Sequence, residues 1–120
     1  DRATWRAYRA MDGGHSAVET TTGSDALAKF QDNYAAWAAQ GLHAGGVYRV
    51  TIQTVDVGEA SSNTAVVFTC VDQHDTDLIK ADGTSSGRDL QHNYLYMATL
   101  DRSSGSWIVV SDERMGVDQC

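Results

Sequence analysis

Several features that mark disordered chains or nucleic-acid-binding chains are missing from this sequence. It contains no proline and no glutamine-rich tract, so wholesale disorder is not expected. Its nine lysine and arginine residues are scattered, and sixteen acidic residues outnumber them to give a net charge of −7. Nucleic acids and anionic membranes require clustered basic side chains, so we expect neither as a partner.

Long apolar runs are missing as well. No stretch approaches the roughly 20 residues that a membrane-spanning helix needs, so no membrane insertion is expected from this segment. The 120 residues fit one domain, which is long enough to bury a core. No secretory signal is recognisable, but the sequence begins at Asp1 without methionine. Removal of a targeting segment therefore stays open.

Two helices are predicted in the first third of the chain. Residues 1–11 place Trp5 and Tyr8 three positions apart, with three arginines for a solvated surface. Residues 24–40 predict a longer amphipathic helix, because their large apolar residues are spaced three, four and three apart. This apolar stripe consists of Leu27, Phe30, Tyr34 and Trp37.

Capping residues suggest where the second helix begins and ends. Ser24 is a candidate N-cap, since serine accepts hydrogen bonds from free N–H groups at a helix start. Gly41 suits the left-handed position that follows a helix. The preceding residues 15–23 are small, polar and rich in threonine, and they predict a loop.

The rest of the chain predicts an antiparallel sheet. Residues 47–55 alternate, with Tyr48, Val50 and Ile52 on one side, as in a half-buried strand. Residues 64–71 are apolar on both sides and predict a central strand. Further strands are expected at residues 78–79, 92–101 and 106–112. Helices followed by such a sheet are typical of the α+β class.

Several motifs, in order, resemble one family. They are "TTGSDALAKF", "AAQGLHAGG", "FTCVD" and the closing hairpin "YLYMATLDRSSGSWIVVSDERMGVDQC". From Gly23 onward they are similar to a family of actinobacterial secreted proteins and lipoproteins. The resemblance implies the fold of nuclear transport factor 2 (NTF2-like, also called SnoaL-like or cystatin-like). In that fold, helices wrap a strongly curved antiparallel sheet, or cone, and enclose a pocket. The resemblance implies no particular activity.

Cys70 and Cys120 are the only cysteines. In an exported protein an even cysteine count argues for a disulfide. This disulfide would close a loop of 50 residues, and the lost denatured-state entropy would be worth roughly 4 kcal/mol. The alternative is two free thiols in a cytosolic protein. A nucleophilic Cys70 is disfavoured, because an apolar strand interior raises a thiol pKa.

The segment "TCVDQHD" gathers polar side chains after the predicted central strand. Asp72, His74 and Asp75 lie close in sequence, but zinc requires three or four ligands at characteristic spacings. We interpret them as a solvated strand end, and we expect no metal and no cofactor. No G-x-S-x-G motif is present, so no catalytic residue is assigned.

Acid–base chemistry remains an alternative. Ketosteroid isomerases, which share the cone fold, pair a carboxylate with a tyrosine in an apolar pocket. Asp72 would supply the carboxylate, and the phenols on offer are Tyr34, Tyr48, Tyr94 and Tyr96. Aromatic residues at this spacing more often form core. Whether Asp72 shares the face of Cys70 stays open, because that strand is apolar on both sides.

We therefore predict one α+β domain over residues 1–120, the mature extracytoplasmic part of a longer precursor. Its expected role is non-catalytic binding of a small apolar ligand or a protein partner at the cell envelope. The alternative is a small-molecule isomerase, dehydratase or cyclase. The outer sheet face also allows a homodimer, although its polar residues count against that. The predicted pocket lining is Tyr34, Trp37, Tyr48, Phe68 and Tyr96.

Overall fold

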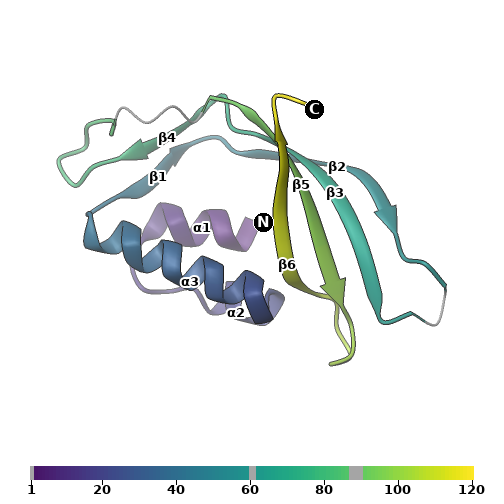
Figure 1. Cartoon of the computed structure of the whole chain (residues 1–120). Coiled ribbons are helices and arrows are strands. Elements are labelled where there is room, and N and C mark those ends of the chain that lie inside the picture. The colour runs from purple at the N-terminus through teal and green to yellow at the C-terminus, as the bar shows by residue number, and fades with distance from the viewer. Residues whose placement is uncertain (1, 60–61, 87–90) are drawn as a thin grey trace.

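A computed structural model describes residues 2–59, 62–86 and 91–120 (Figure 1). The predicted start of the first helix, Asp1, lies outside these residues.

The described residues form helices first and strands afterwards. The helices are α1 (Arg2–Ala10), α2 (Ser16–Thr21) and α3 (Ser24–Ala39). The strands are β1 (His43–Gly46), β2 (Arg49–Asp56), β3 (Thr64–Asp72), β4 (Thr76–Ile79), β5 (Asn93–Asp101) and β6 (Ile108–Val117). Strands β2-β3-β5-β6 form one antiparallel sheet in that order, and β1 pairs with β4 in a second antiparallel sheet. The predicted α+β class is confirmed.

The two sheets meet at a corner of the chain. β1 leads into β2 and β3 leads into β4, so the same two chain segments pair in both sheets. The Val47 N–H donates to the Asp75 carbonyl oxygen at 2.8 Å and ties the two bends together. Figure 1 shows the β1–β4 sheet above α1 and α3, with β6 beside the helices. Helix α1 packs on β1, and α3 packs on β6.

The helical predictions hold better for periodicity than for boundaries. Helix α3 spans the predicted range, and Gly41 has the expected left-handed backbone with φ 67°. The prediction that Ser24 is the N-cap is wrong, because Gly23 occupies the N-cap position and no side chain caps the helix. The loop predicted for residues 15–23 is also wrong, since α2 forms there. Its Val18 is only 1% exposed in the helical core, and this packing overrides the weak helix propensity of the threonines.

Strand β2 differs from its prediction in burial. The strand forms as predicted, but the side chains expected to be half-buried are not: Ile52 is 63% exposed and Val55 is 58% exposed. The strand lies at the edge of the four-stranded sheet, whereas the helices pack on β1 and β6. Strand β3 is central as predicted, with β2 on one side and β5 on the other. Strand β1 was not predicted.

Strand alternation gives the four-stranded sheet two faces. We call the helix-facing side the inner face; on it Asp112 of β6 meets Lys29 of α3, with 3.3 Å between Lys29 Nζ and Asp112 Oδ1. Asp112 pairs with Ala98 of β5, and Tyr96 lies two residues before Ala98, so Tyr96 lies on the same face. Tyr96 in turn pairs with Thr69 of β3 and Arg114 of β6. The opposite, outer face carries residues that alternate with these, Cys70 among them.

Candidate functional site

A cleft of about 300 Å³ lies where α1 and α3 face the corner between the sheets. Every layer of the fold contributes to its walls. The aromatic lining residues are Trp5, Tyr8, Trp37, Tyr48, Tyr94 and Tyr96. These are six of the chain's ten aromatic residues, so the aromatic side chains are concentrated at this one place.

Aromatic rings of the lining pack directly on one another. Trp5 of α1 stacks on Tyr48, with ring centroids 4.9 Å apart and planes at 13°. Tyr8 lies 4.4 Å from Trp37 between ring centroids, which joins α1 to α3. Such surfaces bury planar apolar molecules well and provide polar groups only at the ring edges.

Burial affects the phenols of Tyr8, Tyr48 and Tyr96. It raises the pKa of Tyr8 to about 12 and the pKa of Tyr48 to about 12. Burial also raises the pKa of Tyr96. At neutral pH these hydroxyl groups are therefore neutral hydrogen-bond donors.

Two charged side chains line the cleft, and they differ in their partners. The Asp77 carboxylate accepts hydrogen bonds from the Leu78 N–H at 2.7 Å and from Ser85 Oγ at 2.9 Å. The Arg114 guanidinium lies over the Tyr94 ring, 5.5 Å from its centroid. Among residues 2–59, 62–86 and 91–120, no carboxylate forms an ion pair with Arg114. The cleft thus presents a cation that an anionic group can reach.

The structure places three of the five predicted lining residues in this cleft: Trp37, Tyr48 and Tyr96. Tyr34 is buried in the helical core instead, where its hydroxyl accepts a hydrogen bond from the Gly13 N–H at 2.8 Å. Phe68 pairs with Met97 and lies on the outer face. Ligand binding by the three cleft residues stays a prediction.

The lining residues missed by the sequence analysis include Trp5, Tyr8 and Arg114. The spacing of Trp5 and Tyr8 already indicated a common side of the first helix, which the structure turns towards the cleft. Arg114 lies beyond the predicted end of its strand at residue 112, so no face was assigned to it.

A larger and more open hollow, of about 810 Å³, lies at the end of α3 beside β4. Its lining includes Gln40, Leu42 and Lys80, and no aromatic side chain among the described residues belongs to it. We favour the aromatic cleft as the binding site, because apolar walls with a few converging polar groups characterise small-molecule sites.

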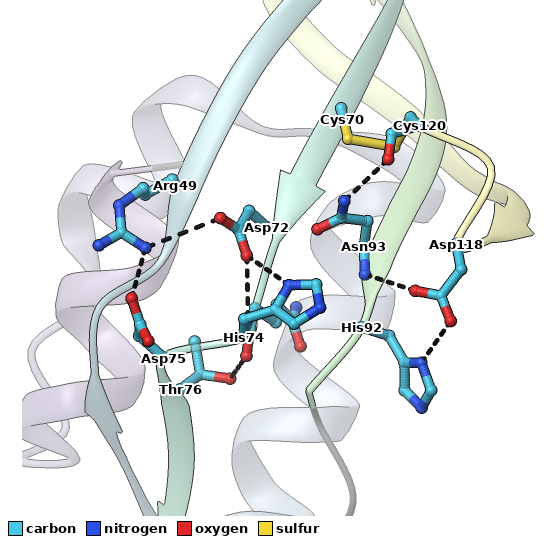
Figure 2. Close-up of polar contacts among 11 residues, drawn as sticks. Arg49, Cys70, Asp72, His74, Asp75, Thr76, His92, Asn93, Asp118 and Cys120 are labelled. Carbon is cyan, nitrogen blue, oxygen red and sulfur yellow. Dashed lines mark hydrogen bonds and ion pairs between the residues drawn. A yellow bond between two sulfur atoms is a disulfide. The ribbon is translucent and has the colours of Figure 1, made fainter.

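The charged residues of "TCVDQHD" gather at the end of β3, outside the cleft lining (Figure 2). Asp72 Oδ1 accepts a hydrogen bond from the His74 N–H at 2.9 Å, and Asp72 Oδ2 lies 3.7 Å from Arg49 Nη1. Arg49 Nη1 also contacts Asp75 Oδ2 at 2.7 Å. Hydrogen bonds from His74 lower the pKa of the Asp72 carboxyl. Asp72 lies two residues after Cys70 in β3, so the two side chains share the outer face. This position, away from the cleft, argues against Asp72 as a pocket acid or base.

The C-terminus is fixed to the same outer face (Figure 2). A disulfide joins Cys70 to Cys120, as predicted, with 5.8 Å between the Cα atoms. Asn93 Nδ2 donates to the Cys120 carbonyl oxygen at 2.8 Å, and Asp118 Oδ1 accepts from the Asn93 N–H at 3.0 Å. The disulfide is compatible with an extracytoplasmic location.

The Asp118 contacts give the fold an acid-sensitive element. Two hydrogen bonds lower the Asp118 pKa below its ordinary value of 3.8. The bond with the His92 side chain has the larger effect, and the bond from the Asn93 N–H has the smaller one. The stabilisation is therefore present above that value and is lost as pH falls through the lowered pKa. Asp118 has a left-handed backbone with φ 55°, which asparagine also tolerates. We therefore expect Asp118→Asn to be less stable at neutral pH and to lose less stability on acidification.

Urea unfolding at a series of pH values measures this effect. Glu113→Gln removes an exposed acid from the neighbouring strand and is the matched control, with the acid dependence of the wild type. An unchanged acid dependence in Asp118→Asn would contradict the linkage.

None of the described helices combines the length and hydropathy that crossing a membrane requires. In residues 2–59, 62–86 and 91–120, no three His, Cys, Asp or Glu side chains are grouped to hold a metal ion.

Comparison with known proteins reveals a similar fold. No protein-family model and no curated protein matches the sequence. The structure is similar to the crystal structure of the intermembrane space region of the chloroplast protein ARC6, with a TM-score of 0.68. The match covers 94% of this chain and 85% of that chain at 14% sequence identity. At this identity the similarity concerns the α+β fold alone.

Proposed function

We propose that this chain is an extracytoplasmic binding module of the NTF2-like cone type, related to the actinobacterial secreted family that its motifs resemble. Its cleft takes a small, planar, mainly apolar ligand that carries an anionic group. The bend of β1 into β2 and of β3 into β4 around the helices supports the cone assignment. The disulfide supports the location.

The concentration of six aromatic side chains around one cleft carries the proposal. A volume of about 300 Å³ lies at the lower end of the range for small-molecule sites. Rings that pack on one another, such as Trp5 on Tyr48 and Tyr8 against Trp37, form a continuous aromatic lining on which a planar molecule can lie.

Arg114 is the reason for the anionic group in the proposed ligand. Its guanidinium lies beside the rings, so a ligand can bury an apolar body and direct a carboxylate, sulfonate or phosphate towards Arg114. The acid–base alternative is less well supported. The cleft carboxylate, Asp77, already accepts two hydrogen bonds, and Asp72 lies on the outer face.

Anilinonaphthalene sulfonate, a planar aromatic anion, is a suitable probe, and phenylnaphthylamine is its uncharged counterpart. We expect Tyr48→Ala to weaken binding of both probes by about tenfold, because it removes one flat wall. Arg114→Gln should weaken binding of the sulfonate alone by a similar factor. Probe fluorescence titrations measure both affinities.

Arg102→Gln provides the matched control, since Arg102 also lies over an aromatic ring, that of Trp107, 5.1 Å from its centroid and away from the cleft lining. It should bind both probes as the wild type does. The proposal fails if neither probe binds saturably to the folded protein, or if Tyr48→Ala retains full affinity while thermal unfolding shows it to be folded. Equal losses of both probes in Arg114→Gln would refute the anionic part.

A further inference from the structure

Strand β2 is an exposed apolar edge of the four-stranded sheet. Ile52 and Val55 are 63% and 58% exposed, and Val57, just after the strand, is 48% exposed. Proteins usually protect such edges with charged side chains, above all lysine, with proline, with a β-bulge or with a covering element. Residues 49–56 contain neither lysine nor proline, and α1 and α3 pack on β1 and β6.

The apolar side chains of β2 lie on one face. Val50, Ile52 and Val55 pair with Val71, Thr69 and Val67 of β3, which are the inner-face positions of that strand. A register shift between Ile52 and Thr54 provides the extra residue that keeps Val55 on this side. In Figure 1 the end of β2 and the beginning of β3 extend away from the helices.

We propose that β2 pairs with β2 of a second copy of this chain, antiparallel and about a two-fold axis. The strand begins with Arg49 and ends with Asp56, so its charges are complementary to themselves only in the antiparallel direction. Arg49 would then lie opposite the partner's Asp56, and both belong to the outer face. A parallel arrangement would place like charges together.

The same register matches the apolar residues. When Arg49 lies opposite the partner's Asp56, Val50 lies opposite the partner's Val55, and both belong to the inner face. Thr51 then meets the partner's Thr54 on the outer face. A regular strand would place Val50 and Val55 on opposite faces. The register shift between Ile52 and Thr54 brings them to the same face, so that the two can meet across the interface.

Existing contacts leave Arg49 able to take part. Its Nη1 atom contacts Asp75 at 2.7 Å and Asp72 at 3.7 Å, and a guanidinium has five N–H donors. The pairing would complete the open backbone of β2 and join two four-stranded sheets into one. The inferred interface is independent of the proposed ligand, since β2 contributes no residue to the cleft lining.

Sedimentation equilibrium of the whole chain over a concentration series measures the dimer. Ile52→Lys should raise the dimer dissociation constant by roughly thirtyfold, as expected for loss of a central interface residue. Met115→Lys is the matched control and should dimerise as the wild type does. Met115 is 47% exposed on β6, at the other edge of the same sheet.

A charge exchange tests the register. Arg49→Asp and Asp56→Arg should each be folded monomers, because like charges then face each other across the axis. An equimolar mixture of the two variants should form a heterodimer, since both opposite-charge pairs are restored. The inference is overturned if the wild type stays monomeric at every concentration, if Ile52→Lys dimerises unchanged, or if the mixture fails to associate. Association of β2 with a different protein while the chain alone stays monomeric would also overturn it.

Discussion

Replacing Cys70 and Cys120 together with serine is expected to lower the free energy of unfolding by about 4 kcal/mol. The disulfide closes a loop of 50 residues, and opening that loop restores conformational freedom to the unfolded chain. The change is large beside the roughly 5–15 kcal/mol that stabilises a typical domain. Urea denaturation of the double variant and of the wild type measures the difference.

Reduction of the wild type should reproduce the loss without any substitution. Asn93→Ala is an informative comparison, because it removes the hydrogen bond to the Cys120 carbonyl oxygen and leaves the covalent bond in place. We expect it to cost about 1 kcal/mol. A double cysteine variant as stable as the wild type would show that the outer-face contacts alone hold the C-terminus.

This dependence connects stability to compartment. A disulfide persists in oxidising surroundings and is reduced in the cytosol. In a reducing compartment the chain would lose the tie across its outer face, while the aromatic cleft on the inner face would keep its own contacts. The bond between β3 and the C-terminus thus stabilises the sheet on which Tyr94 and Tyr96 are displayed.

The sequence predicted the elements whose signals are local. The stripe of α3 depends on spacings within one helix, and the central position of β3 follows from apolar residues on both sides. Strand β1 depends on contacts distant in sequence. It reads "HAGG", which has no alternation to detect, and it forms because β4 pairs with it more than thirty residues later.

The candidate site was predicted in part for the same physical reason. Trp37 and Tyr34 belong to one stripe, but Tyr34 lies one turn earlier and packs against α1 and α2 in the helical core. Phe68 belongs to a strand that is apolar on both sides, so only the register with β5 determines its face. Arg114 could not be assigned, because its strand continues past the last residue that the sequence pattern included.

Gly46→Ala is expected to destabilise the corner by about 3 kcal/mol. Gly46 has φ 79°, a conformation that strains any residue with a Cβ atom. A Cβ atom at this position would also overlap the carbonyl oxygen of Asp75, which accepts the hydrogen bond from the Val47 N–H. The side chain would therefore push the two bends apart, and Tyr48, two residues later, would move within the cleft. Urea denaturation measures the loss of stability, and probe titration measures the loss of binding.

Gly83→Ala separates the two causes. Gly83 has nearly the same backbone, with φ 85°, but nothing lies within 4 Å of an added Cβ atom. It should lose only the conformational part, about 1 kcal/mol, and should bind the probes as the wild type does. If the two variants lose equal stability, backbone strain alone explains the effect and the Asp75 contact has no energetic role. If Gly46→Ala is destabilised but binds the probes normally, the corner does not position the cleft.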